Sequence, residues 1–143
     1  MIKIVATALL FSLITFSALA ADEPSTPLGD SMKKIAKAYK QLKLDLKTPS
    51  DASKKDYLDL IATIKTELQT SRGLVPKKAD GLPDDQKTAM VTAFQKSIDD
   101  LAKSVDTLSG DIQDSKWDDA NKEIDVILQQ EKDGHKQFRK KED

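Results

Sequence analysis

The stretch VTAFQKSIDDLAKSVDTLSG, residues 91–110, decides the fold class of this 143-residue chain. Apolar side chains recur in it at intervals of three and four residues: Val91, Phe94, Ile98, Leu101, Val105 and Leu108. This spacing places them on one stripe of an α-helix and leaves the charged residues on the other faces. We expect a helix that begins near Asp84 or Asp85 and closes at Gly110.

Three other segments repeat this period. The first begins with Asp30 or Ser31 as its expected N-cap, the second ends at Gly73, and the last opens near Ser115. Their stripes are Met32, Ile35, Tyr39, Leu42 and Leu46; Tyr57, Ile61, Ile64 and Leu68; and Trp117, Ala120, Ile124 and Leu128. Strand-like alternation is absent from the sequence. We therefore predict an all-α fold, an antiparallel up-down-up-down four-helix bundle.

The first twenty residues, MIKIVATALLFSLITFSALA, have the pattern of a cleaved secretory signal peptide. Lys3 precedes an apolar run, and the small residues Ala18–Ala20 form the expected cleavage site. A retained membrane anchor is the alternative, but the run is short for a span and ends in small residues. We expect residues 21–29 to be a leader and residues 30–143 to be one domain.

Composition excludes several classes of protein. The 23 basic and 24 acidic residues are interleaved, which argues against a nucleic-acid-binding surface. There is no cysteine, so the chain has no disulfide, no thiolate metal site and no Cys-x-x-Cys-His attachment for haem. Any haem would have to be held without a covalent bond.

His135 is the only histidine, and extending the last stripe by 4, 3, 4, 3 from Ile124 brings it into phase with Leu128, Glu131 and Phe138. In an antiparallel bundle the end of the fourth helix lies beside the start of the first, where Met32 is in phase with the core. Helix axes about 8–10 Å apart would let both side chains reach the two faces of a haem iron. Taken alone, Met32 is typical of a core filler and His135 of a surface residue.

Four segments carry a resemblance to a known family: ADEPSTPLGDSMKKIAKAYKQL (21–42), GLVPKKADGLPDD (73–85), SIDDLAKSV (97–105) and GHKQFR (134–139). Together they resemble the cytochrome b562 family, whose members are small periplasmic haem proteins and standard examples of up-and-down bundles. The resemblance covers essentially the whole chain after the signal peptide.

The resemblance implies one non-covalent haem b with Met32 and His135 as axial ligands. It further suggests that the pocket walls come from one end of the bundle, namely from Leu68, Leu74, Pro76, Met90, Phe94 and Phe138. Arg139 is expected to meet a haem propionate. Glu131 departs from the basic residue expected one turn before the histidine.

Two functions follow as hypotheses. The first is a periplasmic electron-transfer protein that is not an enzyme, acts with unidentified redox partner proteins, and is a monomer or weak dimer. It would bind neither nucleic acid nor, after signal cleavage, a membrane. The alternative is a haem-free periplasmic helical module that binds proteins or protects misfolding chains, for which we expect a large exposed apolar groove.

Overall fold

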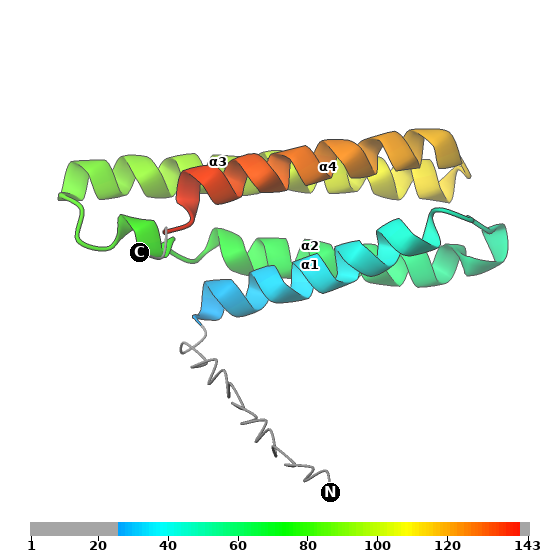
Figure 1. The fold of residues 1–143 in the computed structure, drawn as a ribbon, viewed down its shortest axis with the longest axis horizontal. Helices are drawn as coiled ribbons and strands as arrows, with labels where there is room; N and C mark the ends of the chain where they lie inside the picture. Colours follow the sequence, from blue (N-terminus) through cyan, green and yellow to red (C-terminus); the bar gives the residue numbers. More distant parts are fainter. Residues whose placement is uncertain (1–25, 141–143) are drawn as a thin grey trace, which may run out of the picture.

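The computed structural model describes residues 26–140, which form four long antiparallel helices (Figure 1). They are α1 (Pro27–Asp45), α2 (Lys54–Arg72), α3 (Asp84–Gln113) and α4 (Trp117–Phe138), with two short 3-10 helices, η1 (Asp51–Ser53) and η2 (Lys77–Ala79). No strand occurs in this part of the chain, and none of its helices is long and apolar enough to cross a membrane. The predicted four-helix bundle is confirmed. The expected signal peptide lies outside the described residues.

Two predicted helix ends are wrong, whereas the expected start of α4 near Ser115 is within two residues of the observed one. α1 begins at Pro27 because Thr26 caps it, its Oγ1 accepting a hydrogen bond of 3.0 Å from the Gly29 N–H. Residues 27–29 therefore belong to the first helix and not to a leader. α3 continues past Gly110 to Gln113, and α4 begins at Trp117. Continuation of α3 brings the fully buried Ile112 into the core, one side chain beyond the predicted stripe.

The predicted stripes meet in one core. All four stripe residues of α2 are buried, as are most of those on the other helices. Ile127 of α4 is also buried, although it lies outside the predicted stripe. Met32, Leu101, Trp117 and Leu128 are only partly buried and pack against the edge of this core.

α1 and α4 are spaced more widely than the other neighbouring helices. α1 packs on α2, α2 on α3 and α3 on α4, whereas α1 slants away from α4 toward its own N-terminus (Figure 1). Near the α1–α2 and α3–α4 connections, which we call the turn end, side chains join the two helices. The buried Tyr39 hydroxyl donates to the Ile124 carbonyl, and Asn121 Nδ2 donates to the Leu46 carbonyl at 3.1 Å. The pair is thus fixed at the turn end only.

The opposite end, where α1 begins and α4 ends, is called the pocket end. The α2–α3 connection covers it with the buried residues Pro76 and Ala79, and η2 packs on α3 and α4. Lys78 Nζ donates to the Gln137 carbonyl at 2.7 Å. The rings of Phe94 and Phe138 meet edge to face with their centroids 5.4 Å apart. These contacts fix the last turn of α4 to α3 rather than to α1.

We predict that Tyr39→Phe lowers the free energy of unfolding by about 1 kcal/mol, because the buried hydrogen bond to Ile124 is lost. Burial, followed by the charges of Asp125 and Glu131, raises the pKa of Tyr39 above its ordinary value. As the pH rises above about 10, the unfolded chain loses this proton before the folded one does, so stability falls. The variant should lose this alkaline slope. Urea unfolding at pH 7 and pH 10.5 measures both effects.

Tyr57→Phe is the matched control, because the Tyr57 hydroxyl only accepts a long bond of 3.3 Å from the Ser50 N–H. An equal loss of stability in both variants would contradict a special role for Tyr39.

Candidate cofactor site

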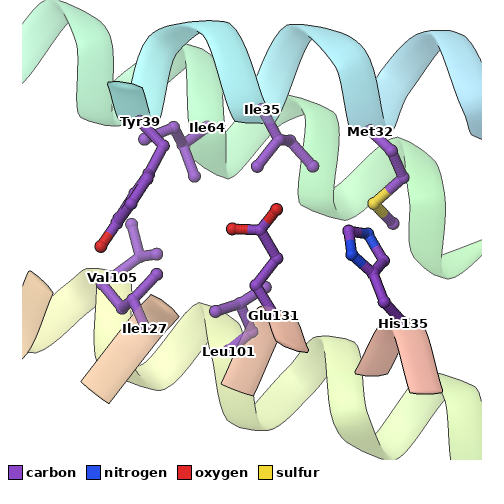
Figure 2. A pocket seen from close by; sticks show the side chains of 9 residues that line it. All are labelled: Met32, Ile35, Tyr39, Ile64, Leu101, Val105, Ile127, Glu131 and His135. Atoms are coloured by element: carbon purple, nitrogen blue, oxygen red, sulfur yellow. The ribbon is translucent and has the colours of Figure 1, made fainter. Parts of the chain in front are cut away.

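A pocket lies between α1 and α4 where these helices diverge, and we call it the α1/α4 pocket (Figure 2). It is lined by Met32, Ile35, Tyr39, Ile64, Leu101, Val105, Ile127, Glu131 and His135. The space between these side chains is about 400 Å³, a figure that includes the part open to solvent. Most of its walls are aliphatic. The pocket is therefore apolar, open on one side, and bounded by all four helices.

Met32 and His135 face each other across this pocket. Figure 2 shows the thioether of Met32, on α1, directed at the imidazole of His135, on α4. Met32 is half-buried, but His135 is exposed and lies at the rim. The sequence placed His135 in phase with the buried stripe, and its neighbour in that phase, Phe138, is indeed buried. His135 remains accessible because α1 and α4 are apart at this level.

The N-terminal half of α1 is held by α2. Ser31 Oγ donates to Glu67 at 2.8 Å, and Lys34 Nζ forms an ion pair of 2.9 Å with the same carboxylate. Hydrogen bonds from Lys34 and Ser31 hold the pKa of Glu67 below its usual value. Ser31 directly precedes Met32, so these contacts fix the methionine's helix from the side away from α4. Each of the two facing residues is therefore positioned by a different neighbouring helix.

Glu131 brings a carboxylate into the same pocket. Its side chain points between Ile35 and Leu101 (Figure 2) and is half-buried. Among residues 26–140 no lysine or arginine forms an ion pair with it. A carboxylate among apolar side chains without a compensating cation loses hydration free energy. Glu131 is thus the least satisfied group of the pocket.

The structure does not bring the other predicted site residues to this pocket. Leu68 and Pro76 are fully buried in the bundle, and Leu74 is half-buried in the α2–α3 connection. Met90 packs against the core, Phe94 and Phe138 pack on each other, and Arg139 is the exposed C-cap of α4. All seven belong to the pocket end, but none of them lines the α1/α4 pocket. Their contact with a haem stays a prediction.

Six lining residues were missed by the sequence interpretation: Ile35, Tyr39, Ile64, Leu101, Val105 and Ile127. All but Ile127 belong to the predicted stripes. Ile35 and Leu101 could have been nominated, since Ile35 lies one turn beyond Met32 and Leu101 lies one turn beyond Ile98 on the core stripe of α3. No signal in the sequence pointed to Ile127.

The family model described as Cytochrome b562 matches residues 27–139, which include both Met32 and His135. The chain belongs to the cytochrome b562 family. No curated protein and no solved structure matches it in the corresponding comparisons. Members of the cytochrome b562 family are periplasmic b-type haem proteins that carry electrons. The predicted family is therefore confirmed, and Met32 and His135 both lie within the matched residues and line the α1/α4 pocket.

We predict that Glu131→Leu raises the free energy of unfolding of the haem-free protein by about 1 kcal/mol, because an unpaired carboxylate leaves an apolar pocket. Glu131→Gln, which keeps the shape and removes the charge, should give a smaller gain. Chemical denaturation at pH 7 measures both changes. A Leu variant less stable than the parent would show that Glu131 has a stabilising contact that the structure lacks.

Proposed function

We propose that this protein is a periplasmic electron carrier that holds one non-covalent b-type haem in the α1/α4 pocket, with Met32 and His135 as axial ligands. The observation that supports the proposal is the facing pair of thioether and imidazole across an apolar pocket. Family membership supports the haem and the electron transfer independently of this pair. Haem iron, when bound, supplies the one-electron chemistry, and a thioether ligand raises its reduction potential.

The chain's own residues would shield the haem from water and supply its ligand atoms. Ile64, Leu101, Val105 and Ile127 exclude water and lower the local dielectric. Neutral His135 would offer one ring nitrogen, while the Met32 thioether has no proton to lose. Because the Tyr39 hydroxyl is already bonded to the Ile124 carbonyl, it closes the deep side of the pocket without presenting a free donor. No substrate is turned over in this proposal.

Arg139 remains our candidate for a propionate contact. It lies four residues beyond His135, is exposed, and forms no ion pair within residues 26–140. Glu131, four residues before His135, would repel a propionate. Arg139 would therefore hold a propionate, and Glu131 would not.

We predict that Met32→Ala and His135→Ala each convert the haem spectrum from low-spin to high-spin and weaken haem retention at least tenfold, because one axial bond is lost. Absorption titration with haem, followed by dithionite reduction, measures ligation and affinity. Met90→Ala is the matched control, since Met90 is half-buried on α3 and does not line the pocket.

A parent protein that shows no Soret band after addition of haem would contradict the proposal, and so would a Met90→Ala variant that behaves like Met32→Ala. Far-UV circular dichroism on each haem-free variant separates loss of ligation from loss of fold.

The alternative, a haem-free protein-binding module, called for a large exposed apolar groove. The exposed large apolar side chains in the described part are Leu44, Val75 and Val126, and each comes from a different element. The α1/α4 pocket is an apolar site among the described residues, and its Met32 and His135 are side chains of the types that ligate haem.

A further inference from the structure

Charge is distributed unevenly along the bundle. In α1 the stretch 33–43 carries five lysines and no acidic residue. At the other extreme, residues 99–125 carry nine acidic residues and three lysines. These residues include the α3–α4 connection and therefore reach the turn end. The near-neutral total charge therefore conceals a lysine-rich α1 and an acidic stretch that runs through the α3–α4 connection.

Part of the positive charge lies close in sequence to Met32 and His135, on the two helices between which the pocket opens. Lys33 directly follows Met32, and Lys132 and Arg139 lie three residues before and four residues after His135. These three side chains, together with Lys37 one turn along α1, are exposed. None of the four has an ion pair or side-chain hydrogen bond among the described residues. We call this set the basic rim.

Acidic residues near the basic rim do not neutralise it. Asp133 is engaged by Lys136 at 3.9 Å and by Gln129 at 3.0 Å. Glu131 points into the pocket rather than outward. Asp30, the remaining acid in this half of α1, is three residues before Lys33 and can offset at most one of the four positive charges. The positive charge of the basic rim is therefore directed at solvent.

We propose that the basic rim is the docking surface for an acidic patch on a partner protein. The proposal rests on the proposed function, because an electron partner must approach the cofactor and the pocket opens between the two halves of the basic rim. Unpaired surface cations attract an acidic partner over roughly the Debye length, about 10 Å at 0.1 M salt. Such attraction raises association rates and fixes orientation more than it adds affinity. The partner class is thus a soluble protein with clustered carboxylates.

Two other occupants fit less well. The acidic end of a second copy is less available, because six of its nine acids are already in ion pairs with Lys43, Lys65, Arg72, Lys96, Lys103, Lys116 or Lys122. An anionic membrane surface is usually bound by cations flanked by large apolar side chains. Leu44 and Val126 lie in the other halves of α1 and α4, and Val75 lies in the α2–α3 connection, so none of them is in the halves of α1 and α4 that carry the basic rim.

The test compares a charge-reversed basic rim with a control of equal charge. The rim variant is Lys33→Glu, Lys132→Glu and Arg139→Glu, and the control is Lys47→Glu, Lys103→Glu and Lys122→Glu at exposed positions nearer the turn end. Haem-free protein is titrated with a short polyglutamate peptide and followed by amide NMR signals at two salt concentrations. Haem-loaded protein is oxidised by ferricyanide, an anionic probe, and by a cationic cobalt complex in stopped flow.

We expect polyglutamate to shift the signals of residues 32–37 and 131–140, with binding that weakens as salt increases. The rim variant should bind the peptide about tenfold more weakly, and its oxidation by ferricyanide should slow by a similar factor at low salt. The control should change either quantity by less than about threefold. With the cationic cobalt complex the effect should be opposite: the rim variant should be oxidised faster than the parent protein at low salt.

Equal effects in the two variants would overturn the proposal, because the effects would then come from the net charge of the protein and not from the position of the basic rim. So would binding to phosphatidylglycerol vesicles without binding to polyglutamate, or self-association that the rim variant abolishes while peptide binding is unchanged. The peptide titration needs no haem, so a protein that fails to bind haem but binds polyglutamate at the basic rim would refute only the proposed function.

Discussion

The separation of α1 from α4 is the constraint on which the rest of this structure depends. Three of the four neighbouring helix pairs pack along their length, and the fourth is closed only where Tyr39 and Asn121 reach across it. The halves of α1 and α4 beyond these contacts are fixed elsewhere, by Glu67 on α2 and by Phe94 on α3. A pocket forms between α1 and α4 because, beyond these contacts, α1 packs on α2 and α4 packs on α3.

Charged side chains near the pocket differ from most carboxylates elsewhere in whether they have a partner. Away from the pocket most carboxylates have partners, as in the paired bonds of 2.7 and 3.1 Å between Arg72 and Asp99, which hold the pKa of Asp99 below its ordinary value. Around the pocket the carboxylate of Glu131 and the cations of the basic rim are left without partners. Glu131 and the basic rim therefore leave unpaired charge where a ligand and a second protein would meet the chain.

Much of this fold could be predicted from the sequence because an apolar period of 3.6 residues fixes which face of a helix is buried. The ends were less predictable. Gly110 looked like a stop, but burial of Ile112 carries α3 onward, and Thr26 with Pro27 formed a better cap than Asp30. Local signals of this kind compete, and tertiary packing decides between them.

Only part of the site could be predicted, because helical phase and topology do not fix the full position of a residue. Topology alone brought Met32 and His135 to one end of one helix pair, and the structure places them opposite each other. The walls were assigned to the end of the bundle, whereas the pocket opens at its side. Phase gives the angular position of a residue around a helix, but neither its depth along the bundle nor the spacing of two helices that do not pack tightly. The exposure of His135 and the role of Ile127 both follow from that spacing.

Because Tyr39 closes the α1–α4 pair at the turn end, the contacts that hold the bundle together are separate from the residues at the opening of the pocket. The contacts that keep the bundle together lie at the turn end, in the core, and on the outer sides of α1 and α4. Glu131 and His135, at the opening, lie outside that buried core. Substitutions there are consequently cheap for the fold, so a lineage can retune its ligand environment or change its partner without first acquiring compensating mutations. Glu131, which forms no ion pair among the described residues, is a position of this kind.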